Sequence, residues 1–237
     1  MFDRHQIGQD FSRASAQYDA HAHLQQQVLR SLWSRLAPLV NEDSLILDAG
    51  CGTGQLAREV RRNIVQLDIA PAMCARAVSQ GIPAVNGTIA ALPFAEHCFD
   101  AVFSSLALQW VEDWQAALQE MERVVKPGGV VAVSTFGANT LRELRESFAS
   151  ADAYPHVSSF IDGGAFERET VTEYVPDLAA LMRHLKHIGA RNKLSARRKS
   201  LFTKRQMQQV ERYYRDRFGE KQGLPVTWEI LYSVKRK

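Results

Sequence analysis

One short segment constrains the fold of this 237-residue chain more than any other. The mostly apolar run 44–47 leads directly into Asp48 and a turn with three glycines, and a helical pattern begins at Gln55. A buried strand that ends in a tight glycine turn and continues as a helix is a βα unit. The segment therefore predicts the start of a layered α/β structure.

The same alternation of strand and helix patterns continues up to Phe136. Further strands are predicted at 64–67, 83–85, 100–104 and 130–134. Helices are predicted at 55–62, 71–80 and 114–125. Strands that alternate with helices form a parallel sheet with right-handed crossovers and helices on both faces.

The two ends of the chain follow a different pattern. Apolar residues at helical spacing predict a helix pair over 11–36, which Pro38 closes. Beyond Phe136 the sequence is mostly helical, with a strand at 170–175, helices at 177–187 and 203–218, and a last strand at 225–234, at or near the sheet edge. We therefore expect one domain with a doubly wound α/β fold and a mostly parallel seven-stranded sheet whose last strand is antiparallel. Residues 1–40 would form an N-terminal helical lid, 41–136 the core, and 137–237 a helical insertion after strand five together with the last strands.

Composition excludes several classes of protein. The chain is 46% hydrophobic and 23% charged with a net charge of +3, which is ordinary for a globular protein. No segment has the unbroken apolar length needed to cross a bilayer, and the first residues lack the apolar region of a signal peptide. The three cysteines, Cys51, Cys74 and Cys98, lack metal-ligand spacing. We expect reduced thiols in a cytoplasmic protein, without disulfides or structural zinc.

The glycine turn lies where doubly wound sheets bind ligands, at the carboxyl ends of the strands. Gly50, Gly52 and Gly54 allow close backbone approach, and the helix start favours an anionic group, although such glycines can serve only helix packing. Gln55 replaces the third glycine of a dinucleotide fingerprint, and Asp48 could meet an ammonium group. Both details favour S-adenosylmethionine over NAD as the ligand.

A second acidic residue ends the next predicted strand. Asp68 could accept hydrogen bonds from both ribose hydroxyls of the ligand, or it could simply cap the following helix. Ile69 and Met73 would then enclose the adenine, unless they are ordinary core residues.

Several longer motifs resemble known families. Leu92-Pro93-Phe94, Phe99-Asp100 and 125–129 resemble class I, Rossmann-like methyltransferases. The segments 11–25, 104–110, 185–190 and 224–228 are similar to the malonyl-[acyl-carrier protein] O-methyltransferases of biotin synthesis. This second resemblance spans nearly the whole chain.

The resemblance implies methyl transfer from S-adenosylmethionine to the free carboxylate of a malonyl thioester, an early step of biotin synthesis. A carboxyl with a pKa of roughly 4 is already ionised near neutrality, so no catalytic base is expected. The candidate cofactor-binding residues are Tyr18, Gln25, Asp48, Gly50, Cys51, Gly52, Gly54, Gln55, Asp68, Ile69, Met73, Thr88, Ile89, Ser104 and Leu106.

The chain departs from the family pattern at three places. The helix after the glycine turn is short, so that Asp48 and Asp68 lie closer in sequence than usual. Thr88 stands where the family usually has an acidic residue that meets the adenine amine, and the segment 161–168 is shorter than the expected lid helix. On the predicted leading helix, Tyr18, His21 and Gln25 share one face, which could close over the ligand. Amphipathic packing alone would also explain that spacing.

Between Leu178 and Val210 the chain has no acidic residue. The basic residues there are Arg183, Lys186, Arg191, Lys193, Arg197, Arg198, Lys199, Lys204 and Arg205. We expect the segment 183–205 to dock an acidic carrier protein, with Lys186, Arg191, Arg197 and Arg198 as candidate contacts. Gln109 and Trp110 are candidates for the wall of the substrate pocket.

Other functions share these features. A solvated basic face without a partner and a nucleic-acid substrate both fit a basic segment. The chain lacks an NPPY-type motif and an RNA-binding module, which makes a nucleic acid the less favoured substrate. Two interpretations compete with this one. The chain could be another class I methyltransferase, or a protein of this fold that only assembles with a partner.

Overall fold

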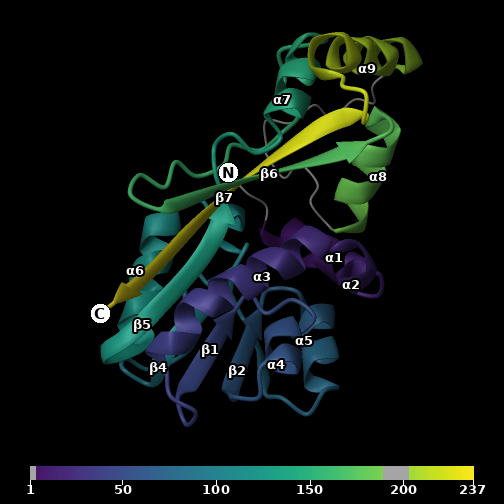
Figure 1. Cartoon of the computed structure of the whole chain (residues 1–237). Coiled ribbons are helices and arrows are strands. Elements are labelled where there is room, and N and C mark those ends of the chain that lie inside the picture. The colour runs from purple at the N-terminus through teal and green to yellow at the C-terminus, as the bar shows by residue number, and fades with distance from the viewer. Residues whose placement is uncertain (1–3, 189–202) are drawn as a thin grey trace.

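The computed structural model describes residues 4–188 and 203–237. Its centre is a seven-stranded sheet with the order β3-β2-β1-β4-β5-β7-β6 (Figure 1). The strands are β1 (Leu45–Ala49), β2 (Asn63–Asp68), β3 (Ala84–Asn86), β4 (Phe99–Ser105), β5 (Val125–Phe136), β6 (Glu167–Val175) and β7 (Leu224–Arg236).

The sheet confirms the predicted fold class. Strands β1 to β5 pair in parallel, and β7 runs antiparallel to both β5 and β6. The last strand in sequence lies one position inside the edge, because β6 covers its outer side. β7 can occupy an inner position because its residues from Leu224 to Tyr232 are buried on both faces.

Alternation along the strands divides the core into two layers. Ile46 of β1 and Phe103 of β4 belong to one cluster of buried residues, whereas Leu47 and Val102 belong to the other. Helices α3 (His23–Leu36) and α4 (Gln55–Glu59) pack in the first cluster, and α6 (Trp114–Val124) packs in the second. Successive side chains of a strand point to opposite faces, so helices on both sides are needed to bury them.

The predicted leading helix pair is wrong in detail. The segment forms three helices, α1 (Arg4–Ala14), α2 (Tyr18–His21) and α3, followed by a short 3₁₀ turn at Ala37–Leu39. The chain leaves helical geometry at Ala22, so α2 and α3 are separate. Figure 1 shows α1 and α2 above the carboxyl ends of the parallel strands.

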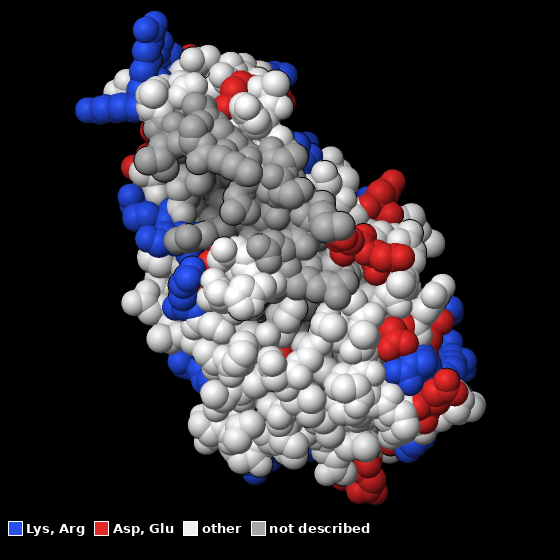
Figure 2. Space-filling model, turned by 180° about the vertical axis from the view of Figure 1, so that it is seen from behind, with Lys and Arg blue, Asp and Glu red and all other residues white. Residues whose placement is uncertain are grey.

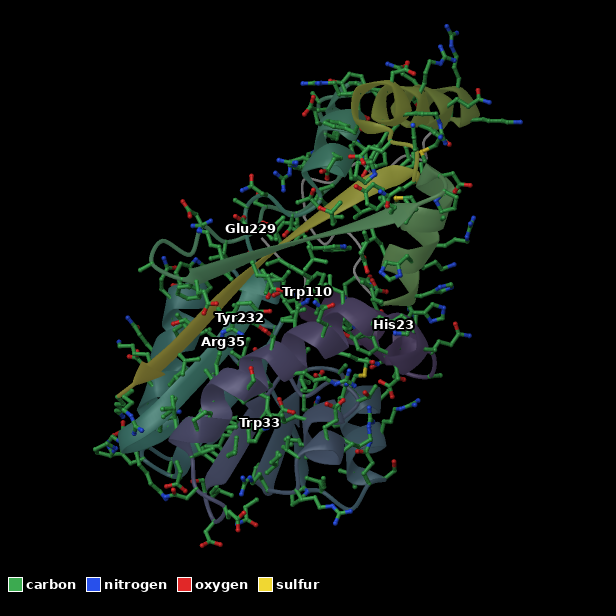
Figure 3. The ribbon with its side chains drawn as sticks, in the orientation of Figure 1. His23, Trp33, Arg35, Trp110, Glu229 and Tyr232 are labelled. Carbon is green, nitrogen blue, oxygen red and sulfur yellow. The ribbon has the colours of Figure 1, made fainter. Side chains whose placement is uncertain are left out.

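Helix α3 fixes this lid to the sheet. Its Trp33 packs edge-on against Phe103 of β4 with ring centroids 6.4 Å apart, and the Arg35 guanidinium lies 4.3 Å from the ring centroid of Tyr232 in β7 (Figure 3). Arg35 also forms an ion pair with Glu167 of β6. The helix therefore contacts β4, β6 and β7 at once and holds the beginning of the chain over the strand ends.

A second group of helices lies above the first. Strands β6 and β7 continue past the other strands and carry α7 (Arg142–Ala149), α8 (Leu178–His187) and α9 (Lys204–Phe218) (Figure 1). The buried Glu143 of α7 accepts hydrogen bonds from the backbone N–H and the hydroxyl of Thr227 in β7. The remaining helices are α5 (Pro71–Val78), which follows β2, and a short 3₁₀ turn at Leu108–Trp110, which follows β4. In the described part of the chain, no helix is both long and apolar enough to span a membrane.

Candidate active site

A small cavity of about 90 Å³ opens at the carboxyl ends of β1, β2 and β4. We call it the donor cavity. Its described lining residues are Ile7, Phe11, Tyr18, Gly50, Gly52, Asp68, Ile69, Met73, Gly87, Thr88, Ile89, Ser105, Leu106, Ala107, Trp110 and Val111. This is the crevice where the sequence predicts a ligand.

The three glycines of the turn have different tasks. Gly50 and Gly52 have φ values of 89° and 53° and line the donor cavity, and a Cβ on Gly50 would lie 2.6 Å from the Cβ of Ala107. Gly54 does not line the cavity. A Cβ there would meet the Gln66 side chain and Ala77 of α5, so Gly54 serves helix packing.

Asp68, at the end of β2, is held by two backbone N–H groups. One carboxylate oxygen accepts a hydrogen bond from the Gly52 N–H at 2.9 Å, and the other accepts one from the Ala70 N–H, just before α5, at 2.8 Å. Burial raises the pKa of Asp68, while these backbone bonds oppose that shift. Each carboxylate oxygen can accept a second bond, so Asp68 can keep both backbone bonds and still accept hydrogen bonds in the cavity it lines.

Asp48 is a buried carboxyl behind the donor cavity. One of its oxygens has no hydrogen-bond partner among the described residues. Burial, reinforced by the charge of Asp68, raises the pKa of Asp48 to about 8. The described lining of the donor cavity contains no Lys or Arg. Two buried carboxyls without a nearby cation make this end of the sheet electrostatically suited to a positively charged ligand.

A larger cavity of about 440 Å³ adjoins the first. We call it the acceptor cavity. Its described lining residues are Phe11, Tyr18, Gln25, Leu106, Gln109, Trp110, Phe136, Leu141, Leu144, Phe148, His156, Val157, Ser158, Phe160, Met182, Leu185, Lys186, Ile188 and Trp228. Four of these residues also line the donor cavity: Phe11, Tyr18, Leu106 and Trp110.

The shared wall is held in an unusual conformation. Leu106 has a φ of 51°, a left-handed conformation that a leucine adopts at a cost of about 1–3 kcal/mol. The Leu106 carbonyl accepts a hydrogen bond from the buried Gln109 amide at 2.7 Å, and Gln109 in turn accepts one from Thr135 at 3.1 Å. Gln109 therefore supports the wall from behind while it lines the acceptor cavity.

Neutral hydrogen-bonding groups surround the acceptor cavity near this wall. Three of these groups have no hydrogen-bond partner among the described residues: the Tyr18 hydroxyl, the Trp110 indole N–H and the Gln25 side-chain amide. The oxygen of the Gln25 amide is also buried. Figure 3 shows Trp110 close to the lid helices, and its ring packs edge-on against Phe11 at 5.3 Å. Burial, with the charges of Asp68 and Asp19, raises the pKa of Tyr18, so its hydroxyl remains protonated.

Asp19 is a residue whose role the sequence did not indicate. Its carboxylate accepts hydrogen bonds from the hydroxyl of the buried Thr53 in the glycine turn, from Arg58 of α4 at 3.2 Å and from Arg76 of α5 at 3.5 Å. Arg76 also donates to the Ser15 carbonyl at 3.1 Å. Asp19 thus ties the lid to the glycine turn directly beside Tyr18. Only its place in the motif 11–25 could have drawn attention to it.

The shared helix face predicted for Tyr18, His21 and Gln25 is interrupted. Because the helix breaks at Ala22, Tyr18 and Gln25 reach the acceptor cavity from α2 and α3, whereas His21 turns to α8. The rings of His21 and His187 lie 4.3 Å apart. Lys186 of the same helix lines the acceptor cavity.

The predicted site residues fall into three groups. Most of them line one of the two cavities, and Gln25 lines the acceptor cavity rather than the donor cavity. The predicted residues that line neither cavity are Asp48, Cys51, Gly54, Gln55 and Ser104. Gln55 bonds to Glu59, the Ser104 hydroxyl bonds to the Ala49 carbonyl, and burial raises the pKa of the Cys51 thiol. Arg191, Arg197 and Arg198 lie outside the described residues.

Comparison with known proteins gives a consistent result. Residues 47–133 match the family model described as a methyltransferase domain. A malonyl-[acyl-carrier protein] O-methyltransferase of Xylella fastidiosa is 33% identical, and the match covers 98% of this chain and 88% of that protein. The protein of the same name from Herminiimonas arsenicoxydans is 34% identical, with 99% and 96% covered.

Solved structures agree on the fold. A SAM-dependent methyltransferase of Thermotoga maritima superposes with a TM-score of 0.53 at 18% identity, covering 94% of this chain and 98% of the other. At this level of identity the likeness concerns the fold alone.

Proposed function

Because this chain belongs to the family of malonyl-[acyl-carrier protein] O-methyltransferases, we propose that it transfers a methyl group from S-adenosylmethionine to the free carboxylate of a malonyl thioester. The product is the methyl ester. The resemblance places this reaction early in biotin synthesis. The observation that carries the proposal is the pairing of a near full-length family match with two cavities that share one wall.

The donor cavity has the features that S-adenosylmethionine requires. When bound, this ligand supplies an electrophilic methyl group on a positively charged sulfonium. Two buried carboxyls, Asp48 and Asp68, favour a cationic ligand there, and the backbone at Gly50 and Gly52 accepts close approach. We assign Asp68 to the ribose hydroxyls and Ile69 and Met73 to the adenine. Thr88 offers a hydroxyl at the position where the family usually has an acidic residue.

The reaction needs positioning rather than a base. A malonyl carboxylate is ionised at neutral pH, and the chain must hold its oxygen in line with the methyl group and exclude water. The lining of the acceptor cavity is mostly apolar, which disfavours water at the reacting atoms. Tyr18, Trp110 and Gln25 present neutral groups that orient a carboxylate, and neutral donors reduce its nucleophilicity less than an ion pair does.

The carrier protein would meet a basic surface. In the described part of the chain, Arg183, Lys186, Lys204 and Arg205 are exposed. Figure 2 shows Lys and Arg gathered along the side of the molecule formed by α8 and α9, whereas on the opposite side Asp and Glu are mixed with Lys and Arg. We propose that an acidic carrier docks on this basic side, where charge complementarity mainly raises the association rate.

The decisive experiment supplies the purified protein with radiolabelled S-adenosylmethionine and one acceptor at a time. Malonyl-carrier protein, malonyl-coenzyme A and total RNA serve as acceptors. Label on the malonyl thioesters, released by mild alkali as methanol, supports the proposal. Label on RNA would assign a different substrate, and cofactor binding without transfer to any acceptor would identify a binding protein of the same fold.

Carrier docking has a separate test. Reversal of charge at Arg197 and Arg198 should raise KM for malonyl-carrier protein more than for malonyl-coenzyme A. Equal changes for the two thioesters would remove the docking proposal and leave the methyl transfer untouched.

A further inference from the structure

Two surface clefts adjoin the acceptor cavity, and either could admit the arm that carries the thioester. The first cleft, of about 460 Å³, lies on the α7 side and shares His156, Val157 and Phe160 with the acceptor cavity. The second, of about 360 Å³, lies between α1 and α8 and shares Lys186 with it. We call them the α7 cleft and the α8 cleft.

The charges in the α7 cleft leave one cation uncompensated. Arg145 lines this cleft, donates hydrogen bonds to the carbonyl oxygens of Ala138 and Thr140 at 3.1 and 2.9 Å, and forms no ion pair with a described carboxylate. Partial burial lowers the pKa of its guanidinium. The two backbone carbonyls occupy only part of the five N–H donors of an arginine.

The carboxylate in the same cleft is already engaged. Asp152 accepts hydrogen bonds from His156 at 2.7 Å and from the Tyr154 backbone N–H at 3.0 Å. The His156 ring is stacked on Phe148, with centroids 4.5 Å apart. Tyr154, with 55% of its surface exposed, adds an apolar face to the cleft. This combination suits an anion on an uncharged, flexible chain.

The α8 cleft is less suited to an anion. It lies at the C-terminal ends of α1 and α8, whose free carbonyl groups disfavour negative charge. Its Arg13 is already paired with Asp10 at 3.1 Å, and both residues line the cleft. Lys186 is the cation that remains, and it is exposed to solvent.

We propose that the α7 cleft is the entrance for the phosphopantetheine arm of the substrate, and that Arg145 binds its phosphate. The pantetheine chain would pass His156, Val157 and Phe160 and bring the malonyl group to the wall formed by Tyr18 and Trp110. This inference rests on the proposed function, since it assumes a thioester substrate.

The test compares substrates that differ in the phosphate. Malonyl-phosphopantetheine and malonyl-pantetheine are supplied to the wild type, to Arg145→Gln and to the matched control Lys186→Gln, which alters the cation of the other cleft. In the wild type we expect the phosphorylated substrate to have a KM about tenfold lower, the value of one charge-assisted hydrogen bond. Arg145→Gln should reduce this ratio to about one, with KM for malonyl-pantetheine unchanged.

Three outcomes overturn the inference. In the first, Arg145→Gln keeps the ratio of the two KM values and Lys186→Gln keeps it too. In the second, only Lys186→Gln loses this ratio, which would place the entrance at the α8 cleft. In the third, the wild type shows no preference for the phosphate. Since Arg145 bonds to the loop before α7, thermal unfolding of each variant is measured, and Arg145→Lys should restore part of the preference. If no thioester is methylated by the wild type, the proposed function itself fails, and that result is distinct from these three.

Discussion

The donor cavity and the acceptor cavity meet at one wall but are built in different ways. Apart from the lid residues Ile7, Phe11 and Tyr18, the donor cavity is lined by residues between 50 and 111, all from successive βα units. The acceptor cavity takes its walls from residues as far apart as Phe11 and Trp228, and from α7 and α8. The binding of a common cofactor is therefore a local property of the chain, whereas the choice of acceptor depends on segments that meet only in the folded protein.

The largest effect should come from the donor side. Asp68→Ala removes the acceptor for the Gly52 and Ala70 N–H groups together with the proposed ribose contact. Loss of charged hydrogen bonds of about 1.5–3 kcal/mol each predicts at least roughly 100-fold weaker binding of S-adenosylmethionine by calorimetry. Asp43→Ala, at an exposed aspartate outside both cavities, should bind normally. Unchanged affinity of Asp68→Ala for S-adenosylmethionine would show that the cofactor does not bind in the donor cavity.

The second effect is a pH dependence of donor binding. In the free protein Asp48 has a pKa of about 8, so it is mostly protonated at pH 7, and a bound cation favours its ionised form. Affinity should rise by up to about tenfold per pH unit below 8 and level off above it, with proton release at pH 7 detected by calorimetry in two buffers. Asp48→Asn should abolish both the pH dependence of the affinity and the proton release. A flat profile in the wild type would separate Asp48 from the donor site.

The raised pKa of Asp48 also makes the stability of the ligand-free protein depend on pH. The folded state holds a proton on Asp48 that the unfolded chain releases above about pH 4. The contribution of Asp48 to stability is therefore full below about pH 4 and is lost progressively as the pH rises to 8. Chemical denaturation of the wild type and of Asp48→Asn at pH 5 and pH 8 measures the difference.

A third variant tests the connection between the lid and the donor side. Asp19→Ala breaks the bonds to Thr53, Arg58 and Arg76. Because Asp19 and its two arginine partners are partly exposed, a loss of about 1 kcal/mol is expected, which raises the donor KM roughly fivefold. Asp19→Asn should retain part of the affinity through the Thr53 bond. No change in Asp19→Ala would mean that the lid is held by α3 packing alone.

The smallest effect is expected on the acceptor side. Gln25→Leu removes a neutral group from the acceptor cavity and should raise KM for the malonyl thioester about threefold, while donor affinity stays constant. Gln27→Leu, an exposed position on the same helix, is the matched control. Should Gln25→Leu weaken donor binding instead, Gln25 would belong with the donor cavity, as the sequence first suggested.

The sequence alone determined the layered α/β fold, the parallel core and the position of the ligand crevice. These features follow from local patterns, because a strand, a glycine turn and a helix within 44–59 are read from neighbouring residues. The division of tasks among the three glycines was not readable, since it depends on Ala107 beside Gly50 and Ala77 beside Gly54.

Only the tertiary structure decided the acceptor side. The break at Ala22, the turn of His21 toward His187 and the placement of Arg145 and His156 in one cleft depend on how the helices pack. Residue spacing predicts which side chains share a helix face, but it carries no information about which helix faces another. For that reason the methyl donor could be predicted from the sequence pattern, while the proposed path of the acceptor could be formulated only from the folded chain.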